Sequence, residues 1–548
     1  MTQSPPILPE ITDRRFFGHP LGLAVLFFAE MWERFSYYGM RALLTFYLTK
    51  HWLYSDGDAG VIYGAYTALV YITPVLGGYL ADRYLGQRKA VVFGAVLLTL
   101  GHFFMGFEGD GAVGGIRDTA ALNMFWLALA FIIVGSGFLK ANISVIVGQL
   151  YPLTDVRRDG AYTIFYMGIN LGAALGALIC GWLGETYGWS WGFGAAGVGM
   201  LLGLIVFVWG RPLLMGRGEP PSLDRLSAPV AGIKFEWLLY ALGVAAVGAC
   251  WFLVQNQDLV GSFLGVAGGA LVLYVMYTAK AKLTPVERSR IFAALFLIFG
   301  SILFWALFEQ AGSSLNLLTD RVVDRKMLGM EVPASMFQSI NSIYIILLAP
   351  VFAALWTVMG RRGIEPSAPA KFGLAMVQLG AGFLVLVLGA KSVGMGEMIP
   401  VMFIFLIYLL HTMGELCLSP VGLSAMNRLA PAHLASIIMG TWFFASATGN
   451  FVAGLIASAT GSSALEGGAE DMQPGSAAAV EYVQTVTDVY STIGMVAVGA
   501  GIVTVLISPF IKRMMHLESL ENVDHAMAGQ SELAEPQAAG IDTSKETL

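Results

Sequence analysis

Apolar residues in this chain form long runs that short polar segments separate. A helix needs about 20 mostly apolar residues to cross the hydrocarbon core of a membrane. Fourteen runs reach this length, and they predict an all-α polytopic membrane protein with 14 spans. The predicted spans are residues 21–49, 57–81, 89–107, 120–149, 161–184, 192–210, 236–255, 259–279, 290–317, 334–358, 372–390, 399–426, 434–460 and 483–510.

Lysine and arginine are distributed unevenly between the loops. The N-terminal segment and the alternate loops on its side hold 22 of the 31 basic residues, whereas the loops on the other side hold 6. Basic residues favour the cytoplasmic side of a membrane, and an even number of spans places both termini on one side. The sequence therefore predicts that both termini are cytoplasmic.

Two polar connectors divide the spans into groups of six, two and six. Residues 211–235 follow the sixth span, and residues 280–289 precede the ninth. This spacing predicts an N-terminal six-helix bundle at 1–211, a linker with two inserted helices at 212–286, and a C-terminal six-helix bundle at 287–513. The polar remainder, 514–548, is predicted to be a disordered cytoplasmic tail.

Composition supports the membrane interpretation and excludes other classes. The chain is 56% hydrophobic and 12% charged, and the charged fraction is roughly half that of an ordinary soluble domain. The net charge of −6 does not favour nucleic acid as a partner. Cys180, Cys250 and Cys417 lie singly in apolar runs, without the CxxC spacing of a metal site. Because no hydrolase motif stands in a suitable context, an enzyme is not expected.

Ionisable residues inside the predicted spans are the strongest functional signal. Each costs roughly 2.5–3.5 kcal/mol on insertion scales, so they are expected to line a polar pathway, although buried ion pairs that only lock helices together are the simpler alternative. Four acids against three bases leave at least one carboxylate free to titrate. The seven residues are Glu30, Glu33, Arg34, Arg41, Lys140, Glu309 and Glu415.

Helical spacing places several of these residues on common faces. In EMWERFSYYGMR, the residues Glu30, Glu33, Arg34, Tyr37, Tyr38 and Arg41 follow one another at i, i+3, i+4, i+7, i+8 and i+11. These positions share one face of a helix, which is therefore expected to line a cavity. Trp305 precedes Glu309, and Trp442 precedes Ser446, by one turn.

Several motifs resemble those of one transporter family. GGYLADRYLGQRK (residues 77–89) resembles the signature loop of the major facilitator superfamily, in which Asp82, Arg83 and Arg88 are expected to pair and latch one state. EMWERFSYYG (30–39), GSGFLKANIS (135–144), FYMGINLGA (165–173), FWALFEQAGSSLNL (304–317) and GELCLSPVGLS (414–424) resemble segments of the proton-dependent oligopeptide transporters, over nearly the whole chain. The inserted helix pair is similar to that of the bacterial members.

The resemblance implies a major facilitator fold and a proton-coupled symporter that imports di- and tripeptides. It implies that Arg41, Lys140 and Asn170 hold the carboxylate end of a peptide, and that Asn341 and Glu415 hold the amino end. Glu30, Glu33 and Arg34 are expected to couple protons by pairing with Lys140, and Arg41 with Glu309 to gate the outer side, as Asp82 and Arg83 gate the inner side. The expected cavity walls are Tyr37, Tyr38, Tyr71, Trp305, Trp442 and Ser446.

The implied setting is the bacterial inner membrane. The protein is expected to work as a monomer in the lipid bilayer, without nucleic acid and without a cofactor other than the coupling protons. Two departures from the family pattern stand out: Ala141 follows Lys140 where many members have proline, and Gly64 replaces the histidine of animal members. Two alternatives remain open, namely transport of nitrate or another small anion, and a nutrient sensor that binds peptide without moving it.

Overall fold

The fold is a set of long helices that run side by side. The computed structural model describes residues 13–152, 155, 157–431, 434–461 and 473–517, so most of the predicted tail lies outside the described residues. Within these ranges, thirteen helices are long and apolar enough to cross a membrane. α1 (Leu21–Phe46) is also long enough, with 26 residues, but carries four charged residues. The prediction of an all-α polytopic protein is confirmed.

The long helices follow the predicted spans closely. Most differ from the predicted ranges by only a few residues at each end, and α16, at 39 residues, is longer than its prediction. Besides α1, the long helices are α2 (Asp56–Leu80), α3 (Gln87–Met105), α4 (Thr119–Gln149), α5 (Arg157–Tyr187), α6 (Trp189–Trp209), α8 (Phe235–Gln255), α9 (Gln257–Lys282), α10 (Pro285–Phe308), α12 (Ser339–Arg361), α13 (Ala368–Val393), α14 (Met402–Leu429), α15 (Ala435–Ala459) and α16 (Ala477–Met515).

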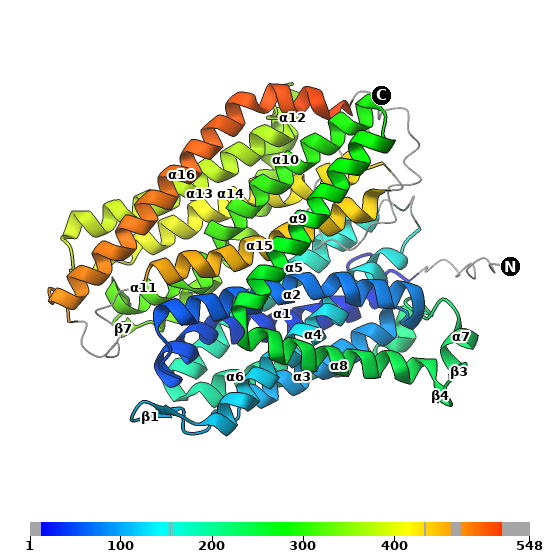
Figure 1. Ribbon diagram of the computed structural model, residues 1–548, viewed down its shortest axis with the longest axis horizontal. Coiled ribbons are helices and arrows are strands. Elements are labelled where there is room, and N and C mark those ends of the chain that lie inside the picture. The colour runs from blue at the N-terminus through cyan, green and yellow to red at the C-terminus, as the bar shows by residue number, and fades with distance from the viewer. Residues whose placement is uncertain (1–12, 153–154, 156, 432–433, 462–472, 518–548) are drawn as a thin grey trace.

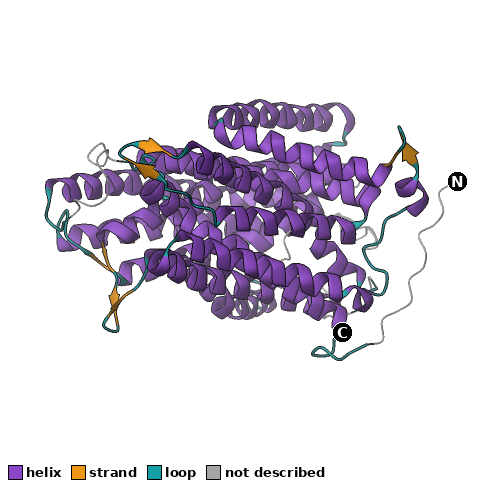
Figure 2. Ribbon diagram, turned by 90° about the horizontal axis from the view of Figure 1, so that it is seen from below, coloured by secondary structure: helices purple, strands orange, loops and turns teal. Residues whose placement is uncertain are grey.

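Short elements lie at the ends of these helices, and the strands pair only in twos (Figure 2). Two of the helices continue as π-helical turns, η1 (Tyr47–His51) and η2 (Ala81–Leu85). The other short elements are β1 (Ala112–Val113), β2 (Ile116–Arg117), η3 (Arg211–Leu214), α7 (Leu223–Ser227), β3 (Pro229–Val230), β4 (Ile233–Lys234), η4 (Glu309–Gly312), α11 (Ser314–Val322), β5 (Val323–Asp324), β6 (Lys326–Met327), β7 (Met330–Glu331), η5 (Ala334–Gln338) and β8 (Ile399–Pro400).

The predicted run 290–317 is interrupted, although it crosses as one span. α10 ends at Phe308, the 3₁₀ turn η4 carries Glu309, and α11 begins at Ser314. Gly312 lets Tyr63 of α2 approach this turn closely, because a Cβ at position 312 would lie only 1.8 Å from the hydroxyl oxygen of Tyr63. The sequence predicted a continuous run because every residue type in the turn except glycine is acceptable in a helix.

The helices gather in two bundles, each around its own hydrophobic core. One cluster of buried side chains lies mainly among residues 23–264, and a second lies among residues 275–515. In Figure 1 the N-terminal bundle (α1–α6) is the blue and cyan group, and the C-terminal bundle (α10–α16) includes the yellow and red helices. The inserted helices bridge the two, since α8 packs on α4 and α9 packs on α15.

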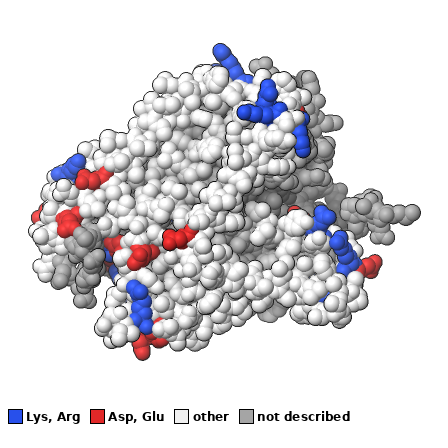
Figure 3. All heavy atoms as spheres, viewed as in Figure 1, with Lys and Arg blue, Asp and Glu red and all other residues white. Residues whose placement is uncertain are grey.

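Charged side chains concentrate at the two ends of the helices. We call the end where α1 begins and α16 ends the termini end; it also carries α7 and the β3–β4 hairpin, whereas β1, β7 and α11 lie at the opposite end (Figure 1). On the face shown in Figure 3, a band with almost no charge separates the two ends, and most of the acidic groups lie at the opposite end. This band is the surface expected to contact lipid.

Candidate functional site

A cavity lies between the two bundles, and both contribute side chains to it. It encloses about 710 Å³ of empty space, including its open side. Seven of the predicted site residues line it, together with six that the sequence analysis did not single out as site residues. The predicted residues are Glu30, Arg34, Tyr71, Lys140, Trp305, Trp442 and Ser446; the others are Pro74, Ala141, Ser144, Phe165, Ser419 and Phe443.

Two acidic residues of α1 share one guanidinium at this cavity. Arg34 contacts Glu30 at 2.7 Å and Glu33 at 3.3 Å, and all three side chains are buried. The spacing of four residues places Glu30 and Arg34 one turn apart on α1, and the long side chain of Arg34 also reaches the carboxylate of Glu33 beside it. A single arginine cannot neutralise both carboxylates, so the second negative charge must be balanced by another cation or by a proton.

Lys140 provides a nearby cation. Its ammonium nitrogen lies 4.3 Å from the centre of the Tyr71 ring, a cation–π distance, and it lines the same cavity as Glu30 and Arg34. The close ion pairs of Glu30 and Glu33 in this state are with Arg34. The predicted coupling of these carboxylates to Lys140 therefore stays a prediction.

Arg41 and Glu309 form the predicted ion pair between the bundles. Arg41 contacts both Glu309 and the hydroxyl of Tyr63, and all three side chains are buried. The ring of Tyr38 lies 5.5 Å from the guanidinium carbon, and Tyr37 packs edge-on against Tyr38. Arg41 and Glu309 are thus in contact in this state, none of these groups lines the cavity, and the gating role of the pair stays a prediction.

The predicted amino-end residues also meet. The Asn341 amide donates to Glu415 and to the hydroxyl of Thr412, both at 3.0 Å. Glu415 lies on α14 one turn before Ser419, which lines the cavity. Asn170 is buried and donates to the backbone carbonyl of Tyr166 in its own helix at 3.1 Å. Its role at the carboxylate end stays a prediction.

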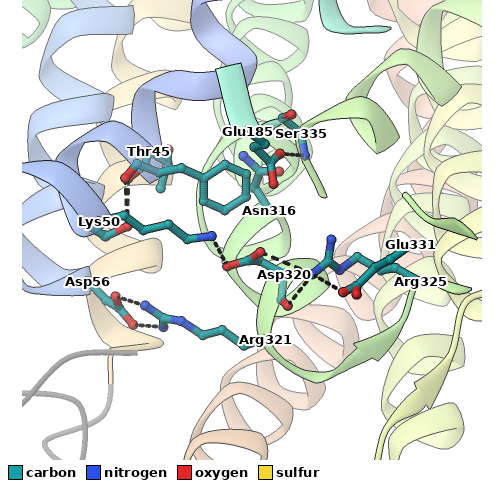
Figure 4. Close-up of polar contacts among 12 residues, drawn as sticks. Thr45, Lys50, Asp56, Glu185, Asn316, Asp320, Arg321, Arg325, Glu331 and Ser335 are labelled. Atoms are coloured by element: carbon teal, nitrogen blue, oxygen red, sulfur yellow. Dashed lines mark hydrogen bonds and ion pairs between the residues drawn. The ribbon is translucent and has the colours of Figure 1, made fainter. Parts of the chain in front are cut away.

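At the opposite end, charged contacts that the sequence analysis missed join the bundles. Lys50 pairs with Asp320 at 2.7 Å, and Asp56 pairs with Arg321 through both carboxylate oxygens (Figure 4). The carboxylate of Glu185 also accepts the backbone N–H of Ser335 at 2.7 Å. In the sequence these charges look like ordinary loop residues, since they flank apolar runs.

Glycines complete the seal at this end. A Cβ on Gly64 of α2 would lie 2.8 Å from the Cα of Gly454 on α15, and a Cβ on Gly60 would lie 3.0 Å from the Cβ of Ala457. The two backbones therefore touch across the bundles. A histidine at position 64 would force them apart, which explains why this chain does not accommodate one there.

The predicted pairing within the signature loop is not what the structure shows, and this expectation needs correction. Asp82 accepts a hydrogen bond from Gln87 at 2.7 Å, and Arg88 forms a bidentate pair with Glu219 at 2.6 and 2.9 Å. Arg83 is exposed. The loop after α6 supplies the partner of Arg88, and sequence spacing alone does not reveal that this loop folds back onto α3. The latching role of Asp82 and Arg83 stays a prediction.

Two helical bundles around a charged cavity, sealed at one end, define a membrane transporter with a major facilitator fold, and not an enzyme. Comparison with known sequences narrows the class: residues 88–472 match the family model described as "PTR2: POT family". The chain belongs to the POT family.

Individual relatives and a solved structure agree with this family assignment. The chain is 37% identical to the peptide transporter YePEPT of Yersinia enterocolitica over 81% of this chain and 88% of that protein. It is 34% identical to dipeptide and tripeptide permease A of Erwinia pyrifoliae, over 82% and 87% of the two chains. A crystal structure of a peptide transporter POT in complex with sulfate superposes with a TM-score of 0.76 at 35% identity, covering 92% of this chain and 97% of that one.

Proposed function

We propose that this protein is a proton-coupled symporter that imports di- and tripeptides by alternating access. The observation that carries the proposal is the cavity, where Glu30, Arg34 and Lys140 of the N-terminal bundle face the aromatic wall of the C-terminal bundle. A second buried carboxylate, that of Glu33, shares Arg34 with Glu30. Relatives that are named dipeptide and tripeptide permeases support the substrate class.

The charges of the site complement a zwitterionic peptide. Lys140, with Arg41 and Asn170, holds the carboxylate end, and Glu415, with Asn341, holds the amino end. Trp305 and Trp442 form walls for the side chains, because aromatic faces accept many shapes without requiring specific hydrogen bonds. The acidic group at Glu415 disfavours nitrate or another purely anionic substrate.

Proton coupling uses the shared guanidinium of Arg34. When Glu30 or Glu33 is ionised and not fully balanced by Arg34, it attracts Lys140; when a proton neutralises it, Lys140 is released to bind the peptide carboxylate. One proton charge that moves down 100 mV supplies about 2.3 kcal/mol, enough for roughly 50-fold accumulation.

Alternating access follows from the seal at one end. Residues of both bundles close the opposite end, with Arg41 and Glu309 deepest, and the cavity lies toward the termini end. Rocking of the bundles about the cavity would break this seal and form another at the termini end, where Asp82 and Arg83 lie. The basic bias of the loops supports a cytoplasmic termini end in a bacterial inner membrane, and a single chain holds the whole site, which supports a functional monomer.

The test is uptake of dialanine into liposomes that contain the purified protein, driven by a pH gradient. The parent protein should accumulate dialanine, and excess nitrate should not compete. Lys140→Ala should abolish accumulation, whereas Lys391→Ala, which removes an exposed lysine at the opposite end, should not. Normal accumulation by Lys140→Ala would contradict the coupling scheme. Dialanine binding without uptake by the parent protein would favour a sensor.

A further inference from the structure

A second cleft lies at the termini end, away from the transport cavity. It encloses about 590 Å³, including its open side, and is formed where the turn after α6 folds against the start of α3. The lining residues are Arg88, Arg211, Pro212, Gly216, Arg217 and Glu219. Apart from Arg88, which belongs to the signature loop, none of them has a role in the proposed transport cycle.

The walls of the cleft are fixed by hydrogen bonds between three segments. The backbone N–H of Arg88 donates to the carbonyl of Gly218 at 2.8 Å, and the N–H of Gly218 donates to the side chain of Gln149 at 2.8 Å. Arg217 is almost fully buried, and it donates to the backbone carbonyl of Met215 at 2.9 Å. The turn is therefore a built structure and not a loose loop.

The cleft has a surplus of positive charge. Three arginines face one acid, and Arg88 already binds both carboxylate oxygens of Glu219. These hydrogen bonds lower the pKa of Glu219, so this residue stays ionised at neutral pH. Arg211 makes only a longer contact of 3.3 Å with Glu219, and its side chain is 60% exposed, so it can turn toward an incoming anion.

Apolar side chains place this cleft at the level of lipid headgroups. Trp209, the last residue of α6, is 80% exposed, and Trp237, near the start of α8, is 63% exposed. Exposed tryptophans at helix ends mark the interface between lipid and water. Leu213 and Met215 are also exposed, beside Arg211 and Arg217 in sequence, so the site presents cations and apolar groups together.

We propose that this cleft binds the phosphate group of an anionic phospholipid from the adjoining leaflet. Arg211 binds the phosphate oxygens, the buried guanidinium of Arg217 adds positive charge behind it, and Leu213 and Met215 contact the lipid beside its headgroup. A free phosphate ion shares the charge but not the apolar contacts, so the lipid is the better match. Such a site would couple the start of α3 and the end of α6 to the lipid composition of that leaflet.

The test compares phosphatidylglycerol with phosphatidylcholine, each titrated into the purified, delipidated protein and measured by native mass spectrometry. Arg211→Gln should weaken phosphatidylglycerol binding about fivefold, which is the effect of one basic residue near a lipid surface. Glu219→Gln should strengthen it, because Arg88 and Arg211 lose a competing anion. Arg362→Gln removes an exposed arginine at the termini end of the other bundle and is the matched control.

Three outcomes would overturn the proposal. Equal losses in Arg211→Gln and Arg362→Gln would mean that only general surface charge attracts the lipid. Equal binding of phosphatidylcholine would remove the role of net charge. If inorganic phosphate displaced phosphatidylglycerol and raised the melting temperature to the same extent, the site would be one for free anions. Because Arg211 is exposed, its replacement should leave the melting temperature without lipid unchanged.

Discussion

Replacing Asp56 with asparagine should open the sealed end of the protein. Asp56 is the first residue of α2, and its carboxylate binds Arg321 of α11 through both oxygens. The two side chains are only 7% and 6% exposed. The guanidinium of Arg321 also lies 5.2 Å from the centre of the Tyr482 ring, so it cannot move to a new partner without losing that contact. The substitution would leave a buried arginine with no balancing charge.

The expected magnitude follows from this burial. Removing one partner of a buried pair costs about 3–5 kcal/mol, and the lower value suits a pair near the rim. When the end opens, water hydrates Arg321. The substitution therefore destabilises the sealed state but changes the free energy of the open state very little. Asp56→Asn should therefore shift the ratio of sealed to open protein about 100-fold toward the open state.

The charge-swapped double variant Asp56→Arg/Arg321→Asp should restore most of the seal. Recovery should be incomplete by about 1 kcal/mol, because an arginine at the start of α2 opposes the helix dipole and the Tyr482 contact is lost. Glu331→Gln is the matched control. Glu331 pairs with Arg325 at 3.1 Å within the C-terminal bundle, so losing this pair should not affect the seal.

Cysteine labelling measures the opening. Thr45 is fully buried in the seal and donates to the carbonyl of Gly312 at 2.6 Å. In a Thr45→Cys background, a water-soluble maleimide should react slowly with the parent, much faster with Asp56→Asn, and slowly again with the swapped pair. The native cysteines are buried and should react little. Equal labelling of Asp56→Asn and Glu331→Gln would refute the reasoning.

Three further substitutions test other parts of the site. Glu309→Gln should weaken the deep ion pair, raise labelling at the same cysteine and slow transport without unfolding the protein; unchanged labelling would show that the pair does not gate. Glu415→Gln should weaken binding of free dialanine more than tenfold, since truncating a buried charge contact costs about 2–5 kcal/mol, but it should affect N-acetylated dialanine little, as competition binding would show. Gly64→Val should separate α2 from α15 at Gly454 and increase labelling, whereas Gly265→Val, with open space beside it, should not.

The sequence predicts those features of the fold that depend on the length of its apolar runs. Span positions follow from runs long enough to cross a membrane, because lipid admits few alternatives to a helix. The pairing of Arg41 with Glu309 was also predictable, since their charges are opposite and their depths are similar along two spans. The family resemblance implied a shared amino-end role for Asn341 and Glu415, and the structure places the two side chains within hydrogen-bonding distance.

Other features depend on tertiary contacts that no local pattern contains. Lys50, Asp56 and Arg321 have the spacing of ordinary charges at helix ends, and only the docking of the bundles makes them partners. The partner of Arg88 is similarly hidden, because Glu219 lies 131 positions later in a connector. The break at Gly312 reflects the approach of Tyr63 from another helix, which periodicity cannot reveal.

The length of α16 has a practical consequence for visualising this protein. Its 39 residues extend about 58 Å at 1.5 Å per residue, and a tilt within the usual range cannot fit that length into a hydrocarbon core of about 30 Å. The first four turns contain Glu481 and Asp488, so this is the part that extends beyond the lipid. The other side of this segment packs on the C-terminal bundle, so the exposed face that holds Glu481, Gln484 and Asp488 is fixed to that bundle and offers an epitope for an antibody fragment. Such a fragment would provide an alignment marker for electron microscopy and report the orientation of that bundle in each state.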